Sequence, residues 1–343
     1  MNLRVLIADD EPLARARIRR LLERDACVSI VDEARNGAEA VRLIERHRPD
    51  LVYLDVQMPK TDGFAVVEQV GADTMPPGLS PRLFAKGIVS TRQGGYGTIV
   101  FSPDHRDAFW KPNGPHLLFM TSEGGVWSAP RVFPSAARPA IDVPFFSPDG
   151  RRLYFMAVTS GAEEKVGNEE IWFVERTGGG WSEPRSFDPV VNSVPMHWQF
   201  SMDAHGHVYL STDGGVACAR FENGRYRAPE KLPAPVNQPH TPEEKYRAGE
   251  VGPFISPKGD YLIFTKFGAG VGLWITFAQR DGGWGEPLNL SERLGGTGND
   301  SAAQVTPDGK YFFVQSVRPG SAPSRSFYWV DTKVIESLRP VVR

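Results

Sequence analysis

The sequence predicts a mainly β fold, in which a five-bladed β-propeller follows a short α/β unit. Three observations predict it. A Ser/Thr-x-Asp-like turn followed by an aromatic-rich run recurs five times, and an aromatic-x-x-Pro-x-x-Phe/Leu segment recurs between the copies. Alternation of strand and helix patterns is confined to the beginning of the chain. We therefore expect two domains, residues 1–77 and residues 78–343.

Composition excludes several classes of protein. The net charge of −2 gives no reason to expect nucleic-acid binding. No apolar run approaches about 18 residues, so we expect no membrane span. The first residues lack the basic stretch and apolar region of a signal peptide, which favours the cytoplasm. Cys27 and Cys218 lie far apart in the sequence, and we expect two buried thiols rather than a disulfide framework.

The first 75 residues read as alternating strands and helices. The apolar run from Leu3 to Ala8 predicts a buried strand, and Pro12 suits the first turn of the helix that follows it. Further on, the pattern predicts a strand over Cys27–Val31, a helix over Gly37–Arg46 and a strand over Leu51–Leu54. This order implies a parallel, doubly wound sheet.

Acidic residues follow the first and third of these strands. Asp9 and Asp10 come directly after the first strand, and Asp55 comes directly after the third. Ligands bind at the carboxyl edge of such sheets, so the three carboxylates should converge there. Clustered carboxylates repel one another unless a hard cation joins them, and Mg²⁺ is the natural one. A metal ion there would neutralise a phosphoryl group transferred to Asp55.

Two stretches carry a family resemblance: VLIADDEPLAR near the start and LVYLDVQMPKTDG around Asp55. They resemble the receiver domains of bacterial two-component response regulators, and the residues DDEPLAR and LDVQMP are most similar to those of LytTR-type regulators. The resemblance implies that Asp9 and Asp10 are the acidic metal-binding pair and that Asp55 is the phosphoacceptor. It also implies that the backbone carbonyl of Gln57 is a metal ligand. A histidine kinase would be a partner if the receiver is functional.

The resemblance ends at about Pro77, so it covers a truncated, flavodoxin-like half-domain. A complete receiver continues to a fourth strand ending in Ser or Thr and a fifth ending in Lys, and these groups help to hold the phosphoryl group. We therefore expect inefficient phosphorylation of Asp55 and exposed apolar surface on the half-domain. The abrupt junction is also what a recent fusion or a misjoined reading frame would produce.

The repeats fill the remainder of the chain. Turn motifs begin at Ser102, Ser147, Ser201, Ser256 and Thr306, at spacings of 45 to 55 residues, which is the size of a propeller blade. The fifth unit lacks the Pro-x-x-Phe segment, but a spare copy stands at Pro81–Phe84. The simplest closed ring has the strand from Leu83 complete the last blade, which removes exposed sheet edges.

The SPDG-strand pattern resembles the PD40 (WD40-like) repeats of TolB-like propellers over about three quarters of the chain. That resemblance implies a binding or scaffold role, and it identifies no ligand. The fold is shared by enzymes and by pure interaction modules, so it does not choose between them.

Polar residues stand where the innermost strands begin, at one mouth of the expected channel: Asp142, His197, Glu250 and Asp300. They could bind a cation, a protein or a polar or glycan ligand, or they could simply be solvated. We favour a non-catalytic scaffold. The alternative is a propeller that hydrolyses or lyses glycans, with Asp142, Glu250 and Asp300 as the carboxylates.

Overall fold

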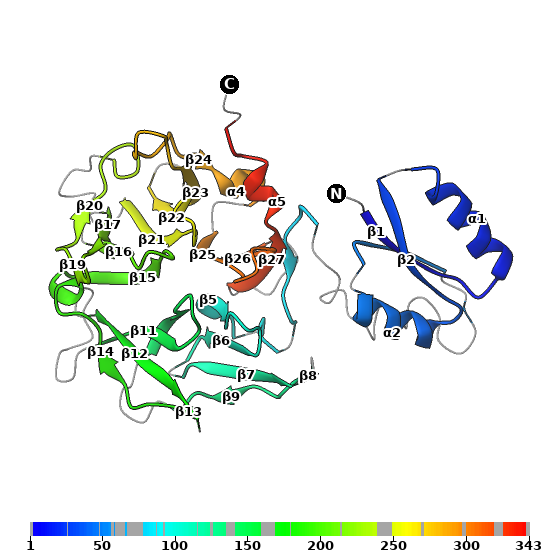
Figure 1. Ribbon diagram of the computed structural model, residues 1–343, viewed down its shortest axis with the longest axis horizontal. Helices are drawn as coiled ribbons and strands as arrows, with labels where there is room; N and C mark the ends of the chain where they lie inside the picture. Colours follow the sequence, from blue (N-terminus) through cyan, green and yellow to red (C-terminus); the bar gives the residue numbers. More distant parts are fainter. Residues whose placement is uncertain are drawn as a thin grey trace. The chain divides into compact units, whose positions relative to one another are not determined.

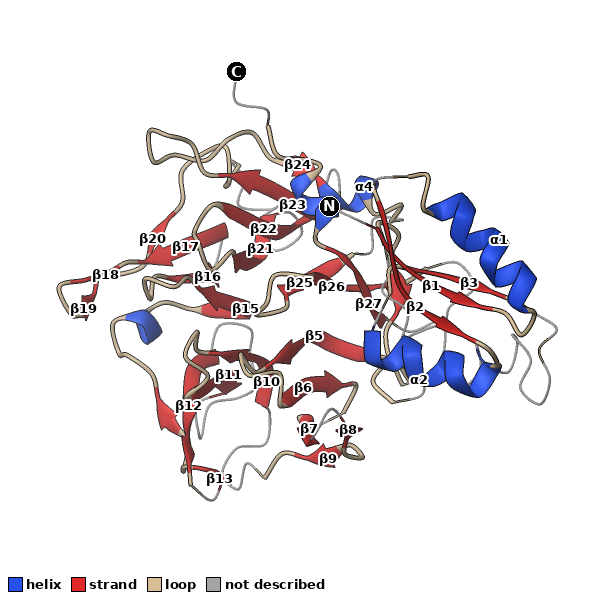
Figure 2. Ribbon diagram, turned by 45° about the vertical axis from the view of Figure 1, so that its right-hand side comes forward, coloured by secondary structure: helices blue, strands red, loops and turns tan. Residues whose placement is uncertain are grey.

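A computed structural model of the chain divides into two units, Met1–Gly78 and Leu79–Arg343. It describes all residues except 1–2, 26, 48, 56–57, 59–65, 67–77, 87, 92, 115, 124–125, 135–140, 159–168, 179, 213–214, 239–248, 269–270, 297–299, 319–324 and 341–343. The two 11-residue helices lie in the first unit, and the described part of the second unit is built of strands with only a few short helices (Figure 2).

The described part of the first unit is a parallel sheet in the order β2-β1-β3, with two helices. Its elements are β1 (Leu3–Ala8), α1 (Pro12–Leu22), β2 (Val28–Ala34), α2 (Gly37–His47) and β3 (Leu51–Leu54). The register pairs Ala8 with Ala34 on one side and with Leu54 on the other. The carboxyl ends of all three strands therefore meet at one edge.

The two helices of this unit are packed very differently. Ala40 and Ile44 of α2 are buried against Leu6 and Ala8 of the sheet. In contrast, α1 has no buried residue, and Leu13 on it is 77% exposed. The first unit thus presents apolar side chains on its surface, as a half-domain is expected to do.

The expectation of two buried thiols is wrong for Cys27, which is exposed, and holds only for Cys218. The strand predicted from Cys27 begins one residue later, at Val28. Cys27 lies in the preceding turn, where its backbone N–H donates to the Asp25 carboxylate at 2.9 Å. Turn residues lie at the surface, and this places the thiol in solvent.

The second unit is a ring of five antiparallel blades (Figure 1), of which blades 2 and 3 are joined into one sheet where Glu169 pairs with Met196. Blade 1 contains β5 (Gly95–Phe101), β6 (Asp107–Pro112), β7 (Leu118–Glu123), β8 (Val126–Trp127) and β9 (Arg131–Val132). Blade 2 contains β10 (Ile141–Phe146), β11 (Arg152–Val158), β12 (Glu169–Thr177), β13 (Gly180–Trp181) and β14 (Arg185–Ser186), and η1 (Val191–Ser193) follows it.

Blade 3 contains β15 (Met196–Met202), β16 (Val208–Thr212), β17 (Gly215–Ala219) and β20 (Glu230–Lys231), with the hairpin β18 (Phe221–Glu222) and β19 (Arg225–Tyr226). Blade 4 contains β21 (Gly249–Ile255), β22 (Tyr261–Phe267), β23 (Gly272–Phe277) and β24 (Leu288–Asn289), and α4 (Leu290–Arg293) follows it. Blade 5 contains β25 (Ser301–Val305), β26 (Tyr311–Ser316) and β27 (Ser326–Asp331), and α5 (Lys333–Glu336) follows it.

The last blade is completed from the front of this unit. Its outer strand is β4 (Arg82–Leu83), which pairs antiparallel with β27. Beside this pair, Phe84 N–H donates to the Phe327 carbonyl at 2.8 Å, and the Ser90 hydroxyl donates to the same carbonyl at 3.1 Å. The two ends of the propeller sequence are thereby joined in one blade, and β27 is paired on both sides.

Burial follows the ring. The described core residues of this unit form five clusters, and each cluster draws on two neighbouring blades. Phe109 of blade 1, for example, packs against Phe146 of blade 2, and Phe254 of blade 4 belongs to a cluster with Val314 of blade 5. Each blade is therefore stabilised mainly by its neighbours, as in other repeat architectures.

Blades 1, 2, 4 and 5 turn between their first two strands through the predicted serine or threonine. In blade 3 the predicted Ser201 lies within β15, and the Asp203 carboxylate takes the turn position, where it accepts from the N–H groups of His205 and His207. In blade 2 the Ser147 hydroxyl donates to Asp149 at 2.6 Å and accepts from Arg152 N–H at 2.9 Å. The same hydroxyl-to-carboxylate bond joins Thr306 to Asp308 at 2.6 Å. The serine or threonine thus closes the turn by serving as donor and acceptor together.

The first strand of every blade carries a register shift, which the sequence patterns do not reveal. Four of the shifts coincide with a positive φ, at Gly97 (71°), Val143 (47°), Gly252 (62°) and Ala302 (53°). These are β-bulges, which insert residues on one strand and turn its course. Glycine suits the conformation, whereas a β-branched residue such as Val143 adopts it only under strain.

Candidate functional site

The three predicted acidic residues of the first unit converge in space. Asp9 follows β1 and Asp55 follows β3, and the Asp55 N–H donates to the Ala8 carbonyl at 2.8 Å. One carboxylate oxygen from each of Asp9, Asp10 and Asp55 lies within 4.8 Å of the other two. The parallel pairing of β1 with β3 produces this convergence, because it brings the ends of both strands to one edge.

Asp9 is held firmly. It is only 9% exposed, and its N–H donates to the Ala34 carbonyl of β2 at 3.2 Å. One carboxylate oxygen accepts the Glu11 N–H at 2.8 Å. Its carbonyl accepts from the Arg15 guanidinium at 2.8 Å.

The donor set fits a hard divalent cation. Three carboxylates supply oxygen ligands, the kind that Mg²⁺ binds in proteins, usually with several waters retained. Gln57, the fourth ligand implied by the resemblance, lies outside the described residues. A cation at this edge would relieve the mutual repulsion of the three carboxylates and supply positive charge beside Asp55.

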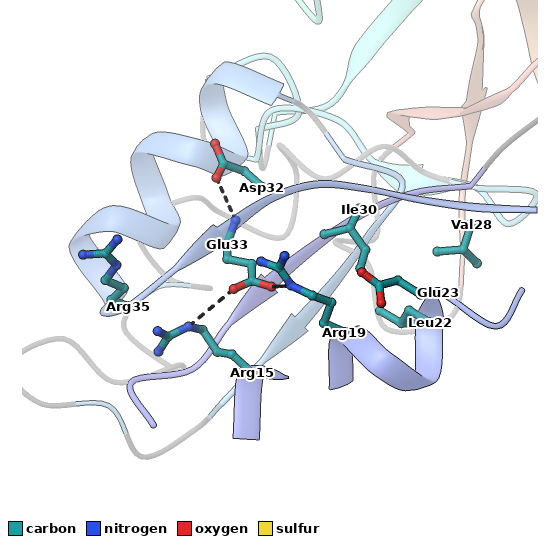
Figure 3. A pocket seen from close by; sticks show the side chains of 9 residues that line it. All are labelled: Arg15, Arg19, Leu22, Glu23, Val28, Ile30, Asp32, Glu33 and Arg35. Carbon is teal, nitrogen blue, oxygen red and sulfur yellow. Dashed lines mark hydrogen bonds and ion pairs between the residues drawn. The ribbon is translucent and has the colours of Figure 1, made fainter. Parts of the chain in front are cut away.

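A cavity of about 510 Å³ lies on the α1 side of β2, lined by charged side chains of both elements (Figure 3). Glu33 accepts from Arg19 at 2.7 Å and forms an ion pair with Arg15 at 3.7 Å. Hydrogen bonding to Glu33 and its negative charge raise the pKa of Arg19. Three arginines and three acids line the cavity in all, so its charges are matched within it.

Sequence reasoning did not single out Arg15, which contacts the Asp9 backbone. Four arginines occur in the predicted helix, and the motif DDEPLAR does not distinguish Arg15 from the others. The signal lies in three dimensions: α1 crosses β2 so that Arg15 contacts both Glu33 and the Asp9 carbonyl. No spacing rule within one helix reports a contact with a different strand.

In the propeller, the structure places the four predicted residues at the beginning of first strands. Asp142, His197 and Glu250 are each the second residue of their strand, and Asp300 immediately precedes β25. The side chains of Asp142 and His197 lie outside the described atoms. Glu250 is fully buried and Asp300 is 1% exposed, so neither carboxylate faces open solvent.

The pairing register further separates these residues. Equivalent residues of the second strands, each nine residues after the turn serine or threonine, can be compared between blades. In blade 2 this residue is Met156, which pairs with Asp142 of the first strand. In blades 4 and 5 the corresponding pairs are Thr265 with Val251 and Gln315 with Ser301. Glu250 and Asp300 therefore lie one residue nearer the strand start than Asp142 does. Because successive side chains in a strand alternate between faces, this offset matters for any shared site.

Asp300 has a partner of its own. Its carboxylate lies 3.4 Å from the Arg318 guanidinium, which also donates to the Leu294 carbonyl at 2.9 Å. The Arg318 side chain is 13% exposed and lies 5.2 Å from the centre of the Tyr328 ring. Removing one partner of a buried ion pair of this kind strongly lowers protein stability, which is consistent with a structural role for Asp300.

Comparisons with known proteins agree with this division. Residues 5–79 match the response regulator receiver domain. Over 75 residues the chain is 40% identical to protein-glutamate methylesterase/protein-glutamine glutaminase 4 of Myxococcus xanthus, covering 22% of this chain and 21% of that protein. It is 40% identical over 74 residues to the transcriptional regulatory protein BtsR of Salmonella typhi, covering 22% and 31%. The chain spans about a fifth to a third of the length of these relatives.

The second unit has solved structural neighbours. TolB from Acinetobacter baumannii superimposes with a TM-score of 0.41 at 13% identity, over 68% of this chain and 53% of that one.

The chain has two parts, an α/β unit that contains the receiver match and a five-bladed β-propeller. Residues 5–79 belong to the response regulator receiver family. Among the described residues, no helix is both long and apolar enough to cross a membrane.

Proposed function

We propose that the chain joins a receiver remnant of two-component signalling, residues 1–77, to a propeller, residues 78–343, that binds a partner without catalysing a reaction. The observation that carries the first half is the convergence of Asp9, Asp10 and Asp55 within 4.8 Å at the carboxyl edge of the sheet. The match of residues 5–79 to the receiver family supports it.

In this proposal Asp9, Asp10 and Asp55 hold Mg²⁺, together with the Gln57 carbonyl that the resemblance implies. When bound, the ion supplies charge that neutralises a phosphoryl group on Asp55. The chain's own contribution is to fix Asp9 from both sides and to bring Asp55 beside it through the β1–β3 pair. A histidine kinase is the expected phosphoryl donor if the receiver is functional.

We infer that Asp55 is phosphorylated inefficiently. The receiver resemblance ends at about Pro77, and the turn motifs and strands that follow are those of the propeller. The hydroxyl of a fourth strand and the lysine of a fifth, which in receivers help to hold the phosphoryl group, have no counterpart in the sequence before the propeller. Without those donors the transferred charge is less well stabilised.

Acetyl phosphate with Mg²⁺ tests this inference on the full chain, with intact mass as the readout. We expect a fractional gain of one phosphoryl group at most, and no gain in the Asp55→Asn variant. A stoichiometric gain in the wild-type protein would show that the half-domain is a competent phosphoacceptor. Gain that persists in Asp55→Asn would place the modification elsewhere.

For the propeller, the burial of Glu250 and Asp300 supports a structural role for these carboxylates and a binding or scaffold role for the ring. The partner would be a protein or a polar or glycan ligand at the channel mouth, and we expect no nucleic-acid binding. A panel of glycans incubated with the protein tests the alternative. Sugar release that Asp142→Asn abolishes without unfolding the propeller would establish a hydrolase or lyase instead.

A further inference from the structure

Asp9 is tied to the rest of the first unit through both of its backbone polar groups. The N–H donates to Ala34 of β2, and the carbonyl accepts from Arg15 of α1. With its side chain also accepting from Glu11 N–H, the residue has little freedom to move. Asp9 is thus positioned in part by a side chain from another element, α1.

Arg15 is itself fixed. Its side chain is 12% exposed and its Nε lies 3.7 Å from Glu33, the residue before Ala34 in β2. The contacts therefore form a closed circuit, from Asp9 to Ala34 and Glu33 of β2, then to Arg15, then back to Asp9. Figure 3 shows Glu33 between Arg15 and Arg19, with both ion pairs drawn.

We propose that Arg15 is a positioning residue for the metal site, which orients Asp9 through the backbone and does not contact the ion. The proposal rests on the proposed function, because it takes the acidic cluster to be the Mg²⁺ site. Partners that orient metal ligands commonly change metal affinity by about 10- to 100-fold when they are removed. The contact here is made to the backbone, so we expect the lower end, about 10-fold.

Charge and position make opposite predictions for this residue, which makes the proposal testable. Arg15 brings a positive charge to within 2.8 Å of the Asp9 carbonyl, and a positive charge near the site repels a cation. If charge dominated, neutralising Arg15 would tighten metal binding. If Arg15 positions Asp9, neutralising it weakens metal binding.

The test is a Mn²⁺ titration of the full chain, with free Mn²⁺ measured by electron paramagnetic resonance. The variants are Arg15→Gln and Arg15→Lys, and Arg19→Gln is the matched control. Arg19 lies on the same helix and bonds to the same Glu33, so its loss removes the same charge. We expect about 10-fold weaker binding for Arg15→Gln, an intermediate loss for Arg15→Lys, and a change within about twofold for Arg19→Gln.

Equal or tighter Mn²⁺ binding by Arg15→Gln, with Asp55-dependent binding in the wild type, overturns this inference alone. Wild-type protein whose Mn²⁺ binding is absent, or is unaffected by Asp55→Asn, overturns the proposed metal site itself. Hydrogen exchange of β1 without metal provides the folding check. Loss of protection there in both Arg15 variants also overturns the inference, because a residue required for the fold is not merely positioning a ligand.

Discussion

Leu83 of β4 lies directly opposite Tyr328 of β27, and this antiparallel pair joins the front of the propeller to its last blade. The next residue, Phe84, places its ring 4.9 Å from Phe313 and 5.5 Å from Trp329, both of blade 5. Phe84 also lies 6.2 Å from Phe101 of blade 1. The seam is thus filled by one aromatic side chain that contacts both blades.

Removing that ring should weaken the whole propeller. We expect Phe84→Ala to lower the free energy of unfolding by about 2–3 kcal/mol, below the value for a fully buried Phe because Phe84 is only partly buried. All eight tryptophans follow residue 78, so tryptophan fluorescence in urea follows this unit. Ile88→Ala, at a side chain 50% exposed in the same segment, is the control and should change stability by less than about 0.5 kcal/mol. Equal effects of the two variants would refute the role of Phe84.

Gly95 allows the closest approach at this seam. A Cβ there would overlap the Phe327 ring, so Gly95→Ala should lower the free energy of unfolding by about 1–3 kcal/mol. Gly178→Ala, where a Cβ would meet nothing within 4 Å, is the matched control. The double variant Gly95→Ala/Phe327→Leu should be less destabilised than the sum of its single changes. Simple additivity in thermal unfolding would show that the ring is not what excludes the methyl group.

The blade turns should make part of the propeller's stability depend on pH. The hydrogen bond from Ser147 holds the pKa of Asp149 below its ordinary value, although burial opposes this. Since the folded pKa is below the unfolded value of about 3.9, the stabilisation is present above about pH 4 and is lost as pH falls through the folded pKa. Asp149→Asn should cost about 0.5–1 kcal/mol at pH 7 and progressively less below pH 4. The free energy of unfolding in urea measures this, and Glu123→Gln, at an exposed carboxylate, is the control. The same loss of stability for Asp149→Asn at pH 3 and at pH 7 would contradict the prediction.

The two thiols should react at very different rates. Burial raises the pKa of Cys218 to about 11, whereas Cys27 is exposed in a turn. Because the thiolate is the reactive form, native protein at pH 8 should release about one equivalent of chromophore rapidly from a thiol-reactive disulfide reagent. The second equivalent should appear only in denaturant, and Cys27→Ser should abolish the rapid phase. Two rapid equivalents in native protein would contradict the burial of Cys218.

Removing one negative charge from the acidic cluster should stabilise the first unit when no metal is present. Asp10→Asn relieves repulsion among carboxylates that lie within 4.8 Å of one another. We expect this to raise the free energy of unfolding of the first unit by about 0.5–1 kcal/mol, the size of such an interaction near the surface. Hydrogen exchange of β1 measures the change, since no tryptophan lies in this unit. Added Mg²⁺ should then protect the wild type more than the variant. Equal protection by Mg²⁺ would mean that Asp10 is not a ligand.

Much of this architecture follows from sequence patterns. The apolar run of β1 predicted a strand of the sheet, and the acids that follow it predicted the acidic cluster. The repeated turns predicted the blades. Each of these features depends on residues that are neighbours along the chain. The spare Pro81–Phe84 segment likewise predicted the strand that closes the ring. These features need only local chemistry and a count of units.

Features that depend on register or on contacts between elements were not predictable. A bulge lies at the same place in the first strands of blades 2 and 4, and no residue pattern marks where a backbone will bulge. The one-residue offset of Asp142 from Glu250 is instead present in the sequence, since Asp142 precedes Ser147 by five residues and Glu250 precedes Ser256 by six. The burial of Glu250 and Asp300 follows from how blades pack, so a sequence that predicts polar mouth residues gives no sign of it. The contact of Arg15 with Asp9 depends in the same way on how α1 crosses the sheet.

The closing strand β4 has a mechanical consequence, since it begins at Arg82, a few residues after the first unit ends at Gly78. Any tension on the N-terminal unit reaches the propeller through the two residues paired with β27. Force applied from that side would therefore act first on this two-residue pair, before it reaches the longer strands of any blade.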